Sequence, residues 1–290
     1  MTLKILLIVI AILGLYFFYY LVKDSLNNKE EYRDSKINNF WLAILSIIIF
    51  FFSTFGISDF ALSTVIYTRL KWLKLKDLIG TINIDSMIPT ILMALIYLSS
   101  VEVGTKTLIV CIVAQIIGGY IGPNIAFVLN EEIIKKIIGV GLIIVSIIVL
   151  LGQLGYINAT GSLKELDGVR LIIAAICLFI YGVLNNVGIG SFSLTMVTMY
   201  LLGLDPRAAF PIMMAATTFS VFVGSLRFIK KGVYNRKIAI YSSTYGLIGV
   251  FIAAYIVKSL DTYYIKWIVL FVFLLTSYTL LSKKFKDSIS

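Results

Sequence analysis

Two aspartates lie inside otherwise apolar stretches of the sequence, Asp59 in FGISDFALST and Asp85 in TINIDSMIPT. A carboxylate in apolar surroundings is costly unless it faces a cavity, a counterion or a proton. Three interpretations of Asp59 stay open: it is the N-cap of a helix at 59–70 or reflects water access from the cytoplasm, it couples an H⁺ or Na⁺ ion, or it binds a cationic substrate directly. Asp85 is the second candidate for ion coupling. An anionic substrate would require Asp59 to be protonated or paired with a cation.

Glycine, hydroxyl and amide residues gather around Asp59 and again around Gly188, and they have the chemistry of an oxyanion site. Glycine permits tight turns and close approach of a ligand to the backbone, while hydroxyl and amide groups donate hydrogen bonds. The alternative is that the small residues only let helices pack closely. The candidate substrate-binding residues are Gly56, Ser58, Ser63, Asn185, Asn186, Gly188, Gly190, Ser191, Ser193 and Thr195.

Composition indicates which solvent surrounds these residues. The chain of 290 residues is 60% hydrophobic and 14% charged, with a net charge of +10. A soluble domain carries about 25% charged residues, so lipid is the expected solvent. The basic residues gather in short segments between apolar runs, which is typical of membrane topology signals and not of a nucleic-acid-binding face. With no histidine and two isolated cysteines, no metal, cofactor or enzymatic constellation is expected.

Long apolar segments recur along the chain, and shorter ones at about 59–70 and 191–202 follow two of them. Each long segment can cross roughly 30 Å of hydrocarbon as a helix, and lipid cannot satisfy the open edges of strands. The predicted class is therefore an all-α polytopic membrane protein. The long segments lie at about 4–22, 38–55, 78–98, 105–128, 132–151, 168–186, 208–226, 236–257 and 263–282.

Two parts of the sequence resemble each other. GISDFALST from Gly56 aligns with GIGSFSLTM from Gly188, and LNEEIIKK from Leu129 aligns with LDTYYIKW from Leu260. Gly118 falls opposite Gly249 at the offset of the second pair, within a GGYIG stretch that indicates a close-packing helix face. The shared order and near-constant offset predict a duplication of residues 38–151 and 168–282.

Charge decides how the two repeats face each other. If each repeat begins with a re-entrant, broken-helix hairpin followed by three crossings, most lysines and arginines fall on one side of the membrane. If each repeat crosses four times, the basic residues divide almost evenly between the two sides. The positive-inside rule favours the first arrangement. We therefore predict an inverted repeat whose hairpin tips, at 55–59 and 185–191, meet near the membrane midplane, where broken helices expose backbone groups to a substrate.

The predicted domain organisation follows from the repeat. An N-terminal transmembrane helix and charged cytoplasmic linker occupy 1–37, an extracytoplasmic loop occupies 152–167 between the repeats, and a basic tail occupies 283–290. The C-terminus is expected in the cytoplasm and the N-terminus outside. Within the second repeat, Thr217 and Thr218 either line the cavity or bond back to their own helix.

The glycine-containing segments resemble the TauE/SafE sulfite exporter family. The resemblance rests on NNVGIGSFSLTMVTMYLLGLDPRAA from Asn185 and GSLRFIKKGVYNRKIA from Gly224, with a weaker echo at Gly56. That family has a glycine-rich hairpin early in each half; here Ser191 and Phe192, and Ser58 and Asp59, stand where it has glycines. The resemblance covers about 38–282, leaves the helix at 4–22 outside, and implies transport of small, often sulfur-containing or organic anions.

These observations predict a secondary transporter in the plasma membrane. Its solute would be sulfite, an organosulfonate or a similar anion, moved by alternating access around the hairpin tips, with H⁺ or Na⁺ as the candidate coupling ion. The alternative is a non-transporting scaffold or assembly protein, although a scaffold needs no polar midplane. The solute, the direction of transport and the oligomeric state, including a homo-oligomer, stay open at this point.

Overall fold

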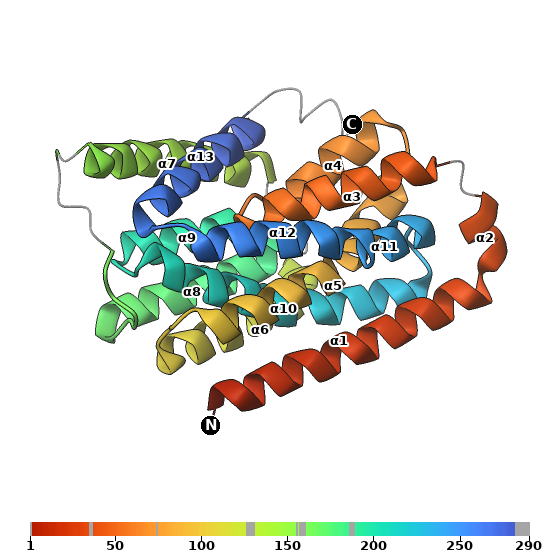
Figure 1. The fold of residues 1–290 in the computed structure, drawn as a ribbon, viewed down its shortest axis with the longest axis horizontal. Helices are drawn as coiled ribbons and strands as arrows, with labels where there is room; N and C mark the ends of the chain where they lie inside the picture. Colours follow the sequence, from red (N-terminus) through yellow and green to blue (C-terminus); the bar gives the residue numbers. More distant parts are fainter. Residues whose placement is uncertain are drawn as a thin grey trace.

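A computed structural model describes residues 2–34, 37–73, 75–125, 131–154, 156, 161–185 and 189–281 (Figure 1). Apart from one isolated β-bridge between Leu163 and Leu204, these residues form helices and loops. The all-α class is confirmed. The helices are α1 (Thr2–Asn27), α2 (Lys29–Asp34), α3 (Asn39–Thr54), α4 (Asp59–Arg69), α5 (Leu75–Ser100), α6 (Thr105–Ile125), α7 (Glu131–Gln153), α8 (Gly168–Asn185), α9 (Phe192–Leu201), α10 (Pro206–Lys231), α11 (Arg236–Ser242), α12 (Tyr245–Ser259) and α13 (Thr262–Leu281).

The molecule has the helices and the surface of a multi-pass membrane protein. Among the described residues, five segments are long and apolar enough to cross a membrane: Thr2–Asn27, Asp77–Ser100, Gly168–Asn185, Pro206–Lys231 and Arg236–Ser259. Large apolar side chains cover the outside of the bundle. Leu15 on α1, Val169 on α8 and Tyr255 on α12 are 73%, 70% and 78% exposed. Such surface is favourable against lipid and unfavourable against water.

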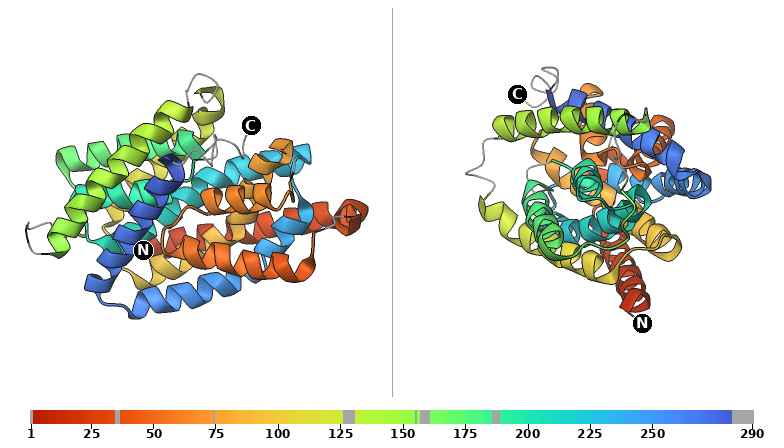
Figure 2. Two further views of the ribbon diagram at one scale, coloured as in Figure 1. Left: turned by 90° about the horizontal axis from the view of Figure 1, so that it is seen from above. Right: turned by 90° about the vertical axis from the view of Figure 1, so that its left-hand side faces the viewer.

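The helices of the two predicted repeats pack in a reciprocal pattern. The first helix of one repeat, α3, packs against α12 of the other, and its counterpart α8 packs against α6. Of the other major pairs, α5–α10 and α7–α13 join equivalent helices, and α6–α10 has its counterpart in the contacts of α5 with α11 and α12. Figure 2 shows α7 and α13 side by side on one face of the bundle. Each major contact of one repeat thus has a counterpart in the other, as a duplicated unit would produce.

Two glycines allow the helices of the pairs α6–α8 and α3–α12 to approach each other closely. A Cβ on Gly118 of α6 would lie 1.9 Å from the Phe179 carbonyl oxygen on α8, and a Cβ on Gly249 of α12 would lie 2.1 Å from the Ile47 carbonyl oxygen on α3. No side chain larger than hydrogen fits at either distance, so the helix backbones touch directly. The predicted close-packing role of Gly118 is confirmed, and Gly249 has the same role in the equivalent place.

Loops gather at two opposite ends of the bundle. At the first, which we call the loop end, residues 101–104, 161–167, 202–205 and 258–261 join one another. Gly104 N donates to Lys164 O at 2.7 Å, Asp205 N donates to Leu163 O at 2.8 Å, and Arg207 donates to Leu260 O. The hairpin α8–α9 begins and ends here, because Leu163 before it and Leu204 after it form the β-bridge.

The opposite end, which we call the linker end, brings together residues 23–34, 37–38, 71–81 and 232–237. Lys237 Nζ donates to Ile37 O at 2.6 Å, Asn235 N donates to Thr81 Oγ1 at 2.9 Å, and Gly80 packs against the Val233 carbonyl. The hairpin α3–α4 begins and ends here. The two hairpins therefore enter the bundle from opposite ends (Figure 1).

The N-terminal helix α1 lies on the outside of the bundle, and side chains of the linker end hold its C-terminal part (Figures 1 and 2). Arg236 Nε donates to Asp24 Oδ2 at 2.8 Å, its Nη1 donates to Glu31, and Tyr234 Oη donates to Asp24 at 2.6 Å. Arg236 is only 5% exposed. Arg236 therefore binds the N-terminal linker through two ion pairs, in addition to acting as one of the basic residues that set membrane topology.

Two features differ from the helices expected from sequence. The charged linker contains a short helix, α2, and the segment expected as one helix at 236–257 divides into α11 and α12. The break lies at Ser243 and Thr244, where the Thr244 Oγ1 bonds back to the carbonyl of Ile240 at 2.8 Å. Back-bonding of this kind bends helices, and Ser242, next to the break, faces the interior.

Candidate functional site

The tips of the two hairpins meet inside the bundle. Ser193 Oγ donates to the Gly56 carbonyl at 2.9 Å, and a Cβ on Gly190 would lie 2.2 Å from Ser58 Oγ. Gly56 has φ +98°, a conformation that side-chain-bearing residues rarely adopt. The tight turn expected at Gly56 is present, and the two broken helices end against each other.

Neutral hydrogen-bonding groups surround the tip of the second hairpin. Ser191, just before α9, lies 2.8 Å from Thr217 Oγ1 on α10 and accepts a hydrogen bond from Gln115 Nε2 at 3.0 Å. Gln115 also reaches Thr217 at 3.3 Å, and its Oε1 is buried with no partner among the described residues. Thr218 instead bonds back to Met214 O at 2.8 Å. Of the two open roles for these threonines, Thr217 thus faces the hairpin and Thr218 supports its own helix.

Acidic groups occupy the equivalent region of the first hairpin. Tyr67 Oη on α4 donates to Asp85 Oδ2 on α5 at 2.7 Å, and the Ser242 hydroxyl lies close to the same tyrosine oxygen. Asp59 begins α4 and is close enough to Asp85 for the two carboxyl groups to interact electrostatically. The N-cap of α4 is Ser58, whose Oγ accepts from Ala61 N at 3.3 Å. The interpretation of Asp59 as the N-cap is therefore wrong, because the preceding serine takes that position.

Within the part of the chain that the structure describes, the acidic cluster of Asp59 and Asp85 has no cationic partner. Asp59 and Asp85 are 4% and 1% exposed, and no lysine or arginine among the described residues pairs with either. Asp59 Oδ2, Asp85 Oδ1 and Ser63 Oγ are buried and make no hydrogen bond of ordinary geometry within the described chain. Two buried ionised carboxylates without a counterion are very costly. The cluster therefore requires a proton or a cation.

The other sequence candidates fall into three groups. Asn185, at the end of α8, is 3% exposed with both side-chain polar atoms unpaired within the described residues, and Thr195 Oγ1 on α9 is likewise buried and unpaired. Gly56, Ser58, Gly190 and Ser193 form the contact between the tips. Asn186 and Gly188 lie outside the described residues.

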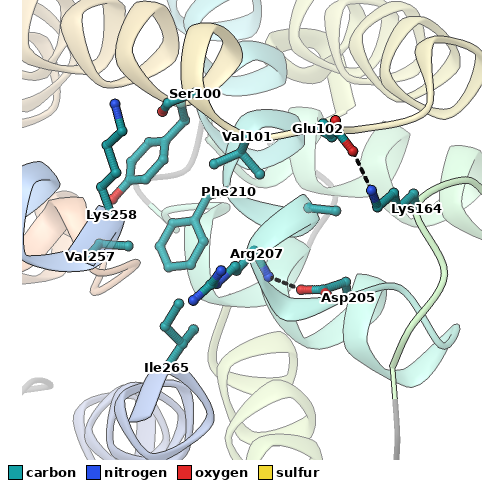
Figure 3. Close-up of a pocket in the computed structure, with 12 residues that line it drawn as sticks. Ser100, Val101, Glu102, Lys164, Asp205, Arg207, Phe210, Val257, Lys258 and Ile265 are labelled. Atoms are coloured by element: carbon teal, nitrogen blue, oxygen red, sulfur yellow. Dashed lines mark hydrogen bonds and ion pairs between the residues drawn. The ribbon is translucent and has the colours of Figure 1, made fainter. Parts of the chain in front are cut away.

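Two cavities flank the hairpin tips. One of about 140 Å³ lies between α4 and α13 and is lined by Ser58 and Thr276, among others. The second, of about 260 Å³, lies at the loop end (Figure 3). Its lining includes Tyr97, which donates to the Thr54 carbonyl at 3.0 Å just before the first tip. The first cavity thus borders the first hairpin directly, and the second is connected to it through Tyr97.

Sequence reasoning missed three polar residues of this region, Tyr67, Tyr97 and Gln115. Gln115 is a single amide in the apolar run TLIVCIVAQIIGG, and that isolation was a usable signal. Tyr67 lies eight positions after Asp59, two helical turns on, and so shares its face of α4. Tyr97 gave no such signal, because tyrosines are common throughout this chain.

The fold and the polar centre define a class: a multi-pass, all-α membrane protein with two broken-helix hairpins that meet in its interior. The chain belongs to the sulfite exporter TauE/SafE family, whose sequence profile matches residues 1–149 and 172–289. The expectation that the helix at 4–22 lies outside the family is wrong, since the match begins at residue 1. Searches among curated proteins and among solved structures return no match. Membership places the chain among membrane transporters of the anion-exporter type.

Proposed function

We propose that the protein is a secondary transporter that moves a small anion, such as sulfite or an organosulfonate, across the plasma membrane by alternating access. The observation that carries the proposal is the meeting of two broken-helix hairpins at a buried set of unpaired polar groups. Transporters place solutes where discontinuous helices end inside the membrane. The family match supports an anion as the solute.

The two repeats are proposed to be inverted with respect to the membrane. The hairpins α3–α4 and α8–α9 enter from opposite ends of the bundle, and the pairs α3–α12 and α6–α8 are reciprocal. The linker end carries much of the basic charge, which favours a cytoplasmic position for it. The N-terminus is then outside and the C-terminus inside, with transport repeats at 38–151 and 168–282.

The anion is proposed to bind at the second hairpin tip. Gln115, Ser191 and Thr217 supply donors without any negative charge, and the unpaired amide of Asn185 adds another. Ser193 and Thr195 are further candidates, and Asn186 and Gly188 stay candidates on the sequence alone. Neutral donors suit a small oxyanion, because desolvated hydrogen bonds to an ionised acceptor are strong.

The ion that drives transport is proposed to bind at Asp59 and Asp85, and we assign it as H⁺. The two buried carboxyl groups have no counterion within the described residues, and the Tyr67 hydroxyl on α4 donates to Asp85 on α5. One proton removes the repulsion between them and lowers the cost of burial. It also removes the negative charge that would repel an anion at the neighbouring tip. The experiment below distinguishes Na⁺ from H⁺ as the driving ion by comparing a sodium gradient with a pH gradient.

The test is a flux assay with the purified full-length chain in proteoliposomes. We expect uptake of sulfite, sulfonates or small organic acids that responds to an imposed pH gradient and not to a sodium gradient. Liposomes without protein and liposomes with the Asp59→Asn variant are the controls. Absence of flux for every anion in the panel would contradict the transport proposal, and a response to sodium alone would replace H⁺ by Na⁺.

A further inference from the structure

The cavity of about 260 Å³ at the loop end is built from segments far apart in the sequence. Its walls come from the end of α5, the segment around Lys164, the start of α10, the end of α12 and the start of α13. It therefore lies where the two repeats meet, on the face opposite the N-terminal linker. Figure 3 shows its charged residues around the ring of Phe210.

Positive charge exceeds negative charge in this cavity. Lys164, Arg207 and Lys258 line it together with Glu102 and Asp205. Glu102 and Lys164 form an exposed ion pair, drawn as a dashed line in Figure 3. The hydrogen bond from Lys164 lowers the pKa of the Glu102 carboxyl below its ordinary value, so the pair stays ionised and internally neutral at pH 7.

Arg207 and Lys258 then face the cavity with Asp205 as the remaining acid. One carboxylate oxygen of Asp205 accepts from the Arg207 backbone N–H at 2.7 Å, as the N-cap of α10. The Arg207 guanidinium donates to Leu260 O, while its Nε is buried with no partner among the described residues. Lys258 forms no ion pair within the part of the chain that the structure describes. Guanidinium and ammonium groups with free donors bind small oxyanions.

The floor of the cavity reaches the hairpin tips. The rings of Tyr97 and Phe210 both line it and stack on each other, with centroids 4.9 Å apart and planes 24° apart. On the far side of this pair, Tyr97 Oη donates to the carbonyl of Thr54, two residues before Gly56. The stacked rings thus separate the charged cavity from the first hairpin tip, and both rings are almost fully buried.

We infer that this cavity is an anion-collecting vestibule: Arg207 and Lys258 attract a small oxyanion to the mouth of the transport pathway, and the stacked Tyr97 and Phe210 rings close that mouth in this conformation. The inference rests on the proposed function for its place in transport, but the electrostatic character of the cavity is independent of flux. A cavity with an excess of one sign of charge raises the local concentration of the opposite ion, more so at low ionic strength.

The first measurement probes the vestibule without any transport. Ser100 lines the cavity and Ser99, next to it, does not; both are exposed and bond only to Ile96 of their own helix. Ser100→Cys and Ser99→Cys are reacted with methanethiosulfonates that carry a sulfonate or a trimethylammonium group. Peptide mass spectrometry separates the introduced thiol from Cys111 and Cys177. We expect the ratio of anionic to cationic reagent rates to be about tenfold higher for Ser100→Cys.

Neutralising single charged side chains then shows which residues cause the preference for the anionic reagent. Adding Lys258→Gln or Arg207→Gln to Ser100→Cys should lower the rate ratio about threefold each, and 1 M salt should remove the difference. Lys266→Gln and Arg170→Gln, which lie near the same end outside the cavity, are the matched controls and should leave the ratio unchanged. Equal ratios for Ser99→Cys and Ser100→Cys, or no response to Lys258→Gln, would overturn the inference. Because Lys258 is exposed, a folding defect does not confound its variant.

Flux links the vestibule to transport. In proteoliposomes, Lys258→Gln should raise the KM for sulfite several-fold at low ionic strength and leave kcat unchanged, because recruitment and not translocation is affected. If the Lys258→Gln variant transports sulfite with an unchanged KM, the vestibule inference is contradicted, while the proposed transport function still stands. If the unmodified chain carries no flux, the proposed function fails, and the thiol measurement still decides the charge of the cavity.

Discussion

The two hairpin tips share a backbone design and differ in chemistry. Each begins with a helix that packs on the opposite repeat, breaks near a glycine and continues as a short helix. In the sequence alignment of the two segments, Asp59 falls opposite Ser191. Asp59 lies close to a second carboxyl group, Asp85, whereas Ser191 contacts the neutral groups of Thr217 and Gln115.

If the two halves arose by duplication, as the sequence predicts, this difference teaches that helix packing was kept while the polar groups at the tips changed. The main contacts that set helix positions correspond in the two predicted repeats, down to Gly118 and Gly249. The polar groups at the tips are not equivalent, since burying two acids and burying hydroxyl groups have unlike energetic costs. Under the proposed function, a neutral site beside an acidic one would hold the anion and the proton at neighbouring places.

The largest effect is expected from making the second tip acidic. Ser191→Asp places a carboxylate among the donors from Gln115 and Thr217, and repulsion between like charges in a buried site costs several kcal/mol. We expect sulfite flux in proteoliposomes to fall by at least about a hundredfold. Ser191→Asn keeps a neutral donor and should retain most of the flux. Unchanged flux in Ser191→Asp would mean that the anion binds elsewhere.

Replacing the acids near the first tip by neutral residues should abolish coupling to the proton gradient and leave anion binding intact. In Asp59→Asn and Asp85→Asn, no proton is gained or lost at the altered position, so uptake driven by a pH gradient should fall about tenfold while downhill exchange continues. Asp167→Asn, which alters only an exposed ion pair with Lys106, is the matched control. Gradient-driven uptake that survives in both acidic-cluster variants would remove these residues from the mechanism.

The equivalence of the packing can be tested by stability. Gly118→Ala and Gly249→Ala each force a methyl group against a backbone carbonyl, and overpacking of this kind costs about 1–3 kcal/mol. Both should lower the thermal unfolding temperature in detergent by similar amounts. Gly224→Ala, where a Cβ would meet only Asn83 at 3.8 Å, should be neutral or stabilising. A loss for one glycine alone would show that the two interfaces differ.

The smallest effect is expected at the unpaired hydroxyls. Ser63 Oγ and Thr195 Oγ1 occupy equivalent positions of α4 and α9, are buried, and make no ordinary hydrogen bond within the described residues. Ser63 Oγ lies close to the Tyr67 hydroxyl without forming a well-aligned hydrogen bond. Ser63→Ala and Thr195→Val therefore remove no strong hydrogen bond, and stability should change by less than about 1 kcal/mol. Tyr67→Phe, which leaves Asp85 without its donor, should cost more. A large loss of stability in both Ser63→Ala and Thr195→Val would show that these hydroxyl groups do form strong hydrogen bonds.

Much of the architecture could be predicted from the sequence because it depends on local hydrophobicity and on charge. The long apolar segments predicted where the helices lie, and the similarity between the segments that begin at Gly56 and Gly188 predicted the two hairpins. The break between α11 and α12 could not be predicted, because it depends on the Thr244 hydroxyl and a serine that faces the interior, and threonine occurs in unbroken helices as well.

The site was predictable only in part. The glycines, serines and aspartates of the tips stand out in apolar surroundings, so their types alone made them candidates. Their partners did not stand out: Thr217 and Gln115 come from other helices, and only tertiary packing brings them to Ser191. The loop-end cavity was beyond reach for the same reason, since its lining spans five separate segments.

The reciprocal seating of the first hairpin helices has a mechanical consequence. Because α3 rests backbone to backbone on α12, and α8 rests likewise on α6, the first helix of each hairpin is seated on the other predicted repeat, while the short helices α4 and α9 pack on α5 and α10 of their own. If the proposed alternating access occurs, a rigid displacement of one repeat would therefore move the hairpin of the other. We expect the two tips to open and close together in that case, so that a substitution at either interface would change access at both.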